Sequence, residues 1–283
     1  LSPNDDGSSA SIPMGVSFPI GLHFFSSWHV AMFVNTNGNI TFSGALPQYT
    51  PNAFPVSSRP MIAPYWADED IRMQDGACDE SAGTSPGYLG CENPTNNSVW
   101  WYLEPGRITV TWDTNGYYSC HTDKRMTFQL VLTAATGCAE PCDFDVEFRF
   151  LQCEWETGDA SGGSGGFGGT EAQAGFDAGD GANYIAIPGS MAPGIANIMC
   201  NDSNVGTPGL WQFQVRSGVV LCPDAGLPCA TGFLGACGQG VTQCIASGTE
   251  CVAVVGPTAE RCDAIDNDCD GETDEDEGMC TIY

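Results

Sequence analysis

The residues with the clearest chemistry are three aspartates at alternate positions near the C-terminus, Asp266, Asp268 and Asp270, with Gly271 directly after them. This spacing fits the calcium-loop pattern D-x-D-x-D-G-x5-E. Ca²⁺ takes about six to eight oxygen ligands, which short carboxylates at alternate positions can supply, and the glycine allows a sharp turn. A solvated acidic tail would not explain this regular spacing, so we predict a Ca²⁺ site here.

The same loop is expected to supply the remaining ligands. Glu272 would offer its backbone carbonyl, and Asp274 a carboxylate or a bridging water. The closing carboxylate would come from Glu275 or Glu277, and the spacing does not choose between them. No amphipathic helix flanks the segment, so we expect an EF-hand-like loop rather than a paired EF-hand.

Two other acidic groups follow apolar runs earlier in the chain. Asp68, Glu69 and Asp70 end the run MIAPYWA, and Asp177 and Asp180 lie in AGFDAGDG. Each group has two interpretations, a second cation site or a purely structural role. We favour the structural role, a hydrogen-bonded strand end in the first case and a turn in the second.

No group of residues in the sequence resembles the machinery of an enzyme. Cys120 and His121 are adjacent, but neighbouring side chains on a strand point to opposite faces, so they cannot pair as nucleophile and base. His23 and His29 stand alone in apolar segments, which favours a structural role. The run GGSGGFGG lacks the Lys-Ser/Thr that follows a phosphate-binding loop. We therefore predict that the protein is not an enzyme.

Composition narrows the class of protein further. The 283 residues carry 35 Asp and Glu against 8 Lys and Arg, a formal net charge of -27. Nucleic acid and anionic lipid need basic patches, so this charge argues against both and favours cations as partners. No apolar run approaches the ~20 residues of a membrane-spanning helix. Because the chain starts at Leu1 without Met, we expect a processed mature form.

The 15 cysteines indicate an oxidising compartment, extracellular or periplasmic. From Cys222 onward cysteines are dense and large apolar residues few, so this segment must rely on disulfides or metal. We therefore place a domain boundary near residue 218 and expect four bridges of undetermined connectivity beyond it. Because 15 is odd, one cysteine of the large domain is free, pairs between molecules or pairs outside this chain. The candidates are Cys120, Cys153 and Cys200.

The elements that position these residues are predicted to be strands, and the fold to be all-β. The central feature is a hairpin over 126–155. In 144–150 apolar and charged residues alternate, which is typical of a strand with one buried face. The nearly continuous apolar run 126–132 predicts a strand in mid-sheet covered on both sides. Between them, Cys138 and Cys142 flank a turn.

Other segments complete the predicted large domain. Hairpins are expected over 30–42, turning at 36–39, and over 98–112, turning at 104–106. Cys78 and Cys91 are expected to form a local disulfide. The Gly/Ser-rich segment 158–169 is expected to be an exposed and mobile loop.

Five phrases in this region resemble the nidogen-like (NIDO) extracellular domain and occur in the family's order. They are VNTNGNITF (34–42), PMIAPYWADEDIR (60–72), TWDTNGYYSCHTDKRMTFQLVL (111–132), EAQAGFDAGDGANY (171–184) and SNVGTPGLWQFQV (203–215), preceded by PNDDGSSASIP. The resemblance implies a β-sandwich-like domain over 1–217. It also implies an extracellular role in adhesion, matrix assembly or surface display, and it brings no catalytic residues.

The C-terminal segment resembles a second family, the MopE-like metal-binding repeat of secreted bacterial proteins. The matching residues are CGQGVTQC (237–244) and ERCDAIDNDCDGETDE (260–275). The two resemblances together imply a bacterial secreted protein. Part of the second family is linked with copper, but copper sites favour imidazole and thioether ligands. The segment has no His and only Met279, which argues against copper.

These observations predict a secreted bacterial surface protein of structural or adhesive type. It would combine a nidogen-like β domain (1–217) with a disulfide-rich, Ca²⁺-binding module (218–283). The sharper hypothesis is self-assembly into an extracellular fibre or layer through strand edges. The alternative is a monomeric adhesin module that binds a foreign glycan or protein.

Overall fold

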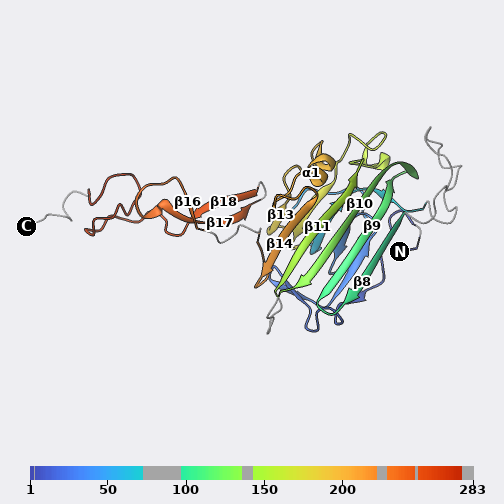
Figure 1. Ribbon diagram of the computed structural model, residues 1–283, viewed down its shortest axis with the longest axis horizontal. Helices are drawn as coiled ribbons and strands as arrows, with labels where there is room; N and C mark the ends of the chain where they lie inside the picture. Colours follow the sequence, from blue (N-terminus) through green and yellow to red (C-terminus); the bar gives the residue numbers. More distant parts are fainter. Residues whose placement is uncertain (3, 73–96, 136–142, 222–227, 246–247, 276–283) are drawn as a thin grey trace, which may run out of the picture. The chain divides into compact units, whose positions relative to one another are not determined.

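The computed structural model describes residues 1–2, 4–72, 97–135, 143–221, 228–245 and 248–275 (Figure 1). The expectations for Cys78, Cys91, Cys138 and Cys142 lie outside these residues. The chain forms two compact units, Leu1–Val220 and Leu221–Tyr283. The division falls close to the boundary placed near residue 218 from the change in composition.

The first unit contains a seven-stranded antiparallel sheet (Figure 1). Its order is β15-β14-β11-β10-β9-β7, and β8 also pairs with β9. The strands are β7 (Glu69–Asp70), β8 (Ser98–Glu104), β9 (Arg107–Tyr117), β10 (His121–Ala134), β11 (Phe144–Cys153), β14 (Leu210–Arg216) and β15 (Val219–Leu221). The pairing of β10 with β11, in which Leu130 lies opposite Phe148, confirms the central hairpin. The pairing of β8 with β9 confirms the hairpin over 98–112.

Burial along β11 follows the alternation in its sequence. Phe144, Val146 and Phe148 are fully buried, whereas the intervening Asp145 and Glu147 are half-buried. Successive side chains on a strand point to opposite faces, so this strand has one dry face and one wet face.

The prediction for 126–132, now part of the neighbouring strand β10, was only partly right. It does lie in mid-sheet, between β9 and β11. Phe128 and Leu130 are buried, but Thr127 and Gln129 on the opposite face are only half-buried. The strand is therefore not covered on both sides along its length, since the described part of the chain leaves Thr127 and Gln129 partly exposed.

A six-stranded sheet forms the second layer, in the order β1-β4-β5-β6-β12-β13. Its strands are β1 (Ile12–Pro13), β4 (Ala31–Asn35), β5 (Asn39–Thr41), β6 (Met61–Trp66), β12 (Gln173–Asp177) and β13 (Tyr184–Ala186). The pairing of β4 with β5 confirms the hairpin over 30–42. Gly38 in its turn has φ +72°, and a side chain there would clash with the Tyr65 carbonyl. A separate two-stranded ribbon joins β2 (Leu22–Phe24) to β3 (Ser27–His29).

Aromatic side chains from both sheets meet in one core. The ring of Phe176 on β12 lies 5.3 Å from Phe148 on β11 and 4.8 Å from Phe213 on β14. Tyr65 on β6 similarly lies 5.9 Å from Phe128 on β10. All five belong to one hydrophobic cluster, so the two sheets pack face to face. The expected β-sandwich-like, all-β fold is confirmed.

A short helix and a glycine-rich loop complete the first unit. The helix α1 (Ile195–Asn201) is tied to β11 by a disulfide between Cys153 and Cys200. Two of the three candidates for the odd cysteine therefore pair with each other. Most of the loop 158–169 is exposed, as predicted, but Gly158, Ser161 and Gly166 are buried. The loop contains the 3₁₀ turn η2 (Asp159–Ser161).

The second unit is small and disulfide-rich. Strands β16 (Pro228–Ala230), β17 (Gln239–Ile245) and β18 (Gly248–Ala253) form a three-stranded sheet, with the 3₁₀ turn η3 (Gly235–Gly238) before β17. Disulfides join Cys229 to Cys251 and Cys237 to Cys269. Within the described ranges, no helix has the length and apolar character that crossing a membrane requires.

Candidate functional site

The three alternate aspartates of the C-terminal loop converge in space. One carboxylate oxygen from each of Asp266, Asp268 and Asp270 lies within 4.8 Å of the others. Asp266 is buried, Asp268 is half-buried and Asp270 is exposed. Oxygens this close repel one another unless a cation or a proton lies between them. The loop therefore presents the hard oxygen ligands that Ca²⁺ prefers.

The backbone of the loop is wound around Asp266. Its Oδ1 accepts a hydrogen bond from the Cys269 N–H at 2.6 Å, and its Oδ2 one from the Gly271 N–H at 3.0 Å. Gly271 has φ +102°, a conformation that other residues rarely adopt, so it supplies the predicted turn.

The second unit anchors this loop at two points. The disulfide between Cys237 and Cys269 joins it to η3. The backbone N–H of Ala236 donates to the Asp266 carbonyl at 2.8 Å. The disulfide framework therefore holds the aspartates close together in a segment with few large apolar residues.

Glu260 is part of the site, although the calcium-loop pattern does not include it. Its side chain is only 4% exposed. Its Oε1 accepts hydrogen bonds from the backbone N–H of Asn267 at 2.6 Å and of Asp268 at 2.8 Å. Its Oε2 accepts one from the Asp274 N–H at 3.0 Å. The only signal in the sequence was that Glu260 begins the segment ERCDAIDNDCDGETDE.

Glu275 forms a second group of carboxylates with Glu260 and Asp268. One oxygen each of Glu260, Asp268 and Glu275 lies within 4.8 Å of the others, and Oε2 of Glu275 is buried without a hydrogen-bond partner. Burial raises the pKa of Asp268, and so does repulsion from Asp270, Glu260 and Asp266. The pKa of Glu275 rises despite a hydrogen bond from its own backbone, through burial and the charge of Glu260. Crowded carboxylates of this kind favour a bound cation.

Among the described residues, the side chains of Asp274 and Glu272 are not part of these carboxylate groups, and the backbone carbonyl of Glu272 stays a predicted ligand. The carboxylate of Asp274 accepts hydrogen bonds from the backbone N–H groups of Asp263 and Ala264, at 3.1 Å for the shortest bond to each. Glu272 has an exposed side chain, and its N–H donates to Asp270 at 2.9 Å. Glu277 lies outside the described residues. Of the two candidates for the closing carboxylate, Glu275 is the one seen near the cluster.

Two acidic groups of the first unit have structural partners. Asp70 forms a bidentate pair with Arg72, and Glu69 accepts a hydrogen bond from Asn115 at 2.6 Å. Asp177 accepts backbone N–H bonds from Val56 at 2.7 Å and Gly179 at 2.6 Å.

Asp180 is used in a similar way. Its Oδ1 accepts hydrogen bonds from the backbone N–H groups of Ala182 at 2.9 Å and Asn183 at 2.7 Å. Its Oδ2 accepts one from the Asn183 side chain at 2.6 Å. These contacts support a structural turn rather than a cation site around Asp177 and Asp180.

Comparison with known proteins identifies the first unit. The family model of the nidogen-like domain matches residues 30–217. The chain belongs to the nidogen-like domain family. This match confirms the resemblance seen in the five sequence phrases, and the cysteine-rich unit lies beyond it.

The relatives of this nidogen-like domain are parts of much longer proteins. The chain is 35% identical over 224 residues to alpha-tectorin of Gallus gallus and 32% identical over 225 residues to alpha-tectorin of Homo sapiens. These alignments cover 75% of this chain and 10% of each tectorin. It is 29% identical over 217 residues to nidogen of Drosophila melanogaster, covering 74% of this chain and 15% of that protein. No solved structure matches the chain. The nidogen-like domain is an extracellular domain, and the chain is an extracellular protein.

The nidogen-like domain presents an aromatic platform on the outer face of its seven-stranded sheet. Trp100 and Tyr102 on β8 are 49% and 60% exposed. In register with Trp100 across the sheet lie Thr111, Gln129 and Arg149. Aromatic rings beside polar side chains are suited to recognising partners with both apolar and polar surface.

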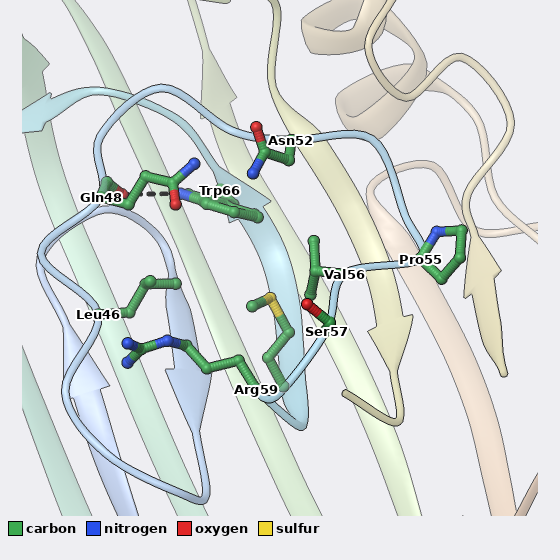
Figure 2. Close-up of a pocket in the computed structure, with 9 residues that line it drawn as sticks. Leu46, Gln48, Asn52, Pro55, Val56, Ser57, Arg59 and Trp66 are labelled. Carbon is green, nitrogen blue, oxygen red and sulfur yellow. Dashed lines mark hydrogen bonds between the residues drawn. The ribbon is translucent and has the colours of Figure 1, made fainter. Parts of the chain in front are cut away.

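A pocket opens on the same domain beside β6 (Figure 2). Its floor is the buried Trp66, whose indole N–H donates to the Gln48 carbonyl at 3.0 Å. The guanidinium group of Arg59 lies at its edge (Figure 2). Its nine lining residues are Leu46, Gln48, Asn52, Pro55, Val56, Ser57, Arg59, Met61 and Trp66. None of these nine side chains carries a carboxylate, an imidazole or a thiol.

Proposed function

We propose that the chain is the Ca²⁺-stabilised part of a secreted, non-enzymatic structural or adhesive protein. The observation that supports the proposal is that two groups of three carboxylates share Asp268 in the C-terminal loop, Asp266, Asp268 and Asp270 in one and Glu260, Asp268 and Glu275 in the other. A nidogen-like domain beside such a loop fits an extracellular setting, where Ca²⁺ is abundant. A bacterial surface remains our proposed setting because the cysteine-rich unit resembles a repeat of secreted bacterial proteins.

Ca²⁺ would act by stabilising the folded second unit. The crowded carboxylates repel one another in the absence of a cation. An ion that binds only the folded loop lowers the free energy of the folded state. A small unit with little apolar surface to bury gains the most from such an ion. The mechanism is therefore stiffening of the C-terminal unit, with no bond made or broken.

Self-association of the nidogen-like domain is the sharper form of the proposal. The six-stranded sheet ends in β1 and β13, whose outer edges have no further strand among the described residues. Such edges can pair with another copy. The net charge of -27 opposes packing of copies, so bound cations would be needed for assembly.

The second candidate function is that of a monomeric adhesin, and the aromatic platform favours it. Trp100 and Tyr102 could stack on a foreign glycan or protein while Gln129 and Arg149 form hydrogen bonds. In that case Trp100→Ala should abolish binding to the ligand in a glycan-array or protein-array screen. The same substitution should leave self-association unchanged.

Hydrogen exchange measured by mass spectrometry tests the Ca²⁺ proposal. Added Ca²⁺ should slow exchange across residues 260–275 in the natural protein. Asp268→Asn should abolish this protection, whereas Glu272→Gln should retain it because the Glu272 side chain is exposed. Equal exchange with Ca²⁺ and with a chelator in the natural protein would contradict the proposal.

A further inference from the structure

A second group of carboxylates lies in the first unit, far from the C-terminal loop in sequence. One oxygen each of Asp5, Asp6 and Asp68 lies within 4.8 Å of the others. Asp5 and Asp6 belong to the N-terminal segment, whereas Asp68 lies in the turn between β6 and β7. The fold therefore adds two partners to Asp68 that are distant from it in the chain.

Backbone hydrogen bonds place the N-terminal segment against this turn. The N–H of Ile71 donates to the carbonyl of Asn4 at 3.0 Å, and the N–H of Thr36 donates to the carbonyl of Gly7 at 2.9 Å. These bonds lie on either side of Asp5 and Asp6, so both carboxylates are held beside the β6–β7 turn.

A shared asparagine also links the two segments. The side-chain amide of Asn37 donates to Asp6 Oδ1 at 2.9 Å. Oδ1 of Asn37 accepts a hydrogen bond from the backbone N–H of Glu69 at 2.9 Å. One buried side chain thus holds Asp6 next to the residue that follows Asp68.

Asp68 is buried and has an unpartnered oxygen. The residue is 1% exposed, and its Oδ1 has no hydrogen-bond partner. Its Oδ2 lies against Gly158 and accepts one long hydrogen bond from Ser161 at 3.5 Å. Oδ1 of Asp5 is likewise buried without a partner. Buried carboxylate oxygens without partners are strongly destabilising, so this arrangement points to a ligand between them.

The charges nearby do not balance. Arg72 forms a bidentate pair with Asp70 and lies 3.5 Å from Asp5. Among the described residues, Asp6 and Asp68 form no ion pair with a basic side chain. Burial and repulsion from neighbouring aspartates raise the pKa of Asp68 to about 8, and that of Asp5 to about 7. The cluster therefore needs positive charge that the protein does not supply.

We propose that Asp5, Asp6 and Asp68 bind a Ca²⁺ ion that fastens the N-terminal segment to the β6–β7 turn. The ligands are all hard oxygens from short side chains, as Ca²⁺ requires. Glu69 and Asp70 are not part of this group of oxygens. Oε2 of Glu69 accepts a hydrogen bond from Asn115, and Asp70 pairs with Arg72. This site and the C-terminal loop belong to different units of the chain, so the loss of Ca²⁺ binding at one does not imply its loss at the other.

Tryptophan fluorescence can test this site in the 283-residue chain. All seven tryptophans lie between Trp28 and Trp211, so their signal reports unfolding of the first unit alone. In the natural protein, Ca²⁺ should raise the urea midpoint of this unit relative to a chelator. Asp68→Asn should remove that gain. In the chelator, the Asp68→Asn variant should be at least as stable as the natural protein, because one repelling charge is lost.

Three controls separate the possible results. Asp268→Asn, in the C-terminal loop, and Glu104→Gln, a half-buried carboxylate of the first unit outside the aspartate cluster, should both keep the full Ca²⁺ gain. NaCl at the same ionic strength should give no comparable gain. If Asp68→Asn does not fold, Asp6→Asn serves as the second variant, since Asp6 is less buried.

Two outcomes would overturn the proposal. One is an equal Ca²⁺ gain in the natural protein and in the Asp68→Asn or Asp6→Asn variant. The other is no gain in the natural protein, which would mean that a shared proton, rather than a metal ion, relieves the repulsion. Neither outcome bears on Ca²⁺ binding by the C-terminal loop.

Discussion

At the scale of single residues, Glu260 organises the C-terminal loop more than any residue of the calcium pattern except Asp266. Its carboxylate accepts three backbone N–H bonds while almost fully buried. In Glu260→Gln one of the two oxygens becomes an N–H donor, so at least one backbone N–H loses its acceptor. We expect a loss of about 1–3 kcal/mol of loop stability, and Ca²⁺ binding weaker by about tenfold or more. Calorimetric titration should show this loss in Glu260→Gln and not in Glu272→Gln. Equal affinities in the two variants would contradict the role given to Glu260.

His29 provides a pH-dependent prediction that is independent of metal. Burial, and then the neighbouring His23, lower the pKa of His29 to about 4, and its ring stacks on Phe42 at 4.5 Å. In the unfolded chain His29 would take up a proton near pH 6.5, whereas in the folded protein it stays neutral until about pH 4. The contribution of His29 to stability should therefore fall as the pH drops below about 6.5, and this loss should level off near pH 4.

The variant His29→Phe isolates this contribution, because it keeps an aromatic ring at the stacking position. Going from pH 7 to pH 5, the urea midpoint from tryptophan fluorescence should fall in the natural protein relative to the variant, because the raised pKa values of Asp5 and Asp68 act equally in both. If the two proteins lose equal stability over this range, His29 is not the group that titrates.

The sequence predicted some site residues and could not predict others. Asp266, Asp268 and Asp270 were recognisable because their ligand spacing is local. Asp5 and Asp6 come together with Asp68 only through long-range contacts, which no local pattern records. Glu260 also lies outside the loop pattern, and only its hydrogen bonds show its role.

At the scale of secondary-structure elements, the hairpins were the most predictable part of the fold. Alternating apolar and charged residues identified β11, and turn residues identified the hairpin closed by Gly38. For 158–169, composition predicted the exposed loop but not the contacts of its buried residues. This glycine-rich loop packs its Gly158 against Asp68, where a larger residue would clash.

The disulfide between β11 and α1 gives a prediction at this scale. Cys153 and Cys200 are separated by 47 residues, so their bond restricts the unfolded chain considerably. Replacing both with alanine should lower the free energy of unfolding of the first unit by about 2–4 kcal/mol. Urea denaturation would measure the loss, with Asn201→Ala at the exposed end of α1 as the control. Equal stability of the double variant and the natural protein would show that the bond contributes nothing to the fold.

At the scale of the whole molecule, the net negative charge is the main obstacle to association between copies. A net charge of -27 keeps copies apart, and the two carboxylate clusters are the places where bound cations would reduce it. Multi-angle light scattering should find larger assemblies with Ca²⁺ and monomers after chelation. A monomer under both conditions would rule out self-assembly and favour the adhesin, whose ligand would then be sought on the aromatic platform.

The most direct measurement counts the Ca²⁺ ions bound to the 283-residue chain. Equilibrium dialysis at about 1 mM Ca²⁺, within the range of extracellular calcium modules, should find at least two ions per chain. Asp268→Asn and Asp68→Asn should each lose one of them. A chain that binds no Ca²⁺ at this concentration would contradict the account at its centre, because neither carboxylate cluster would then be a metal site.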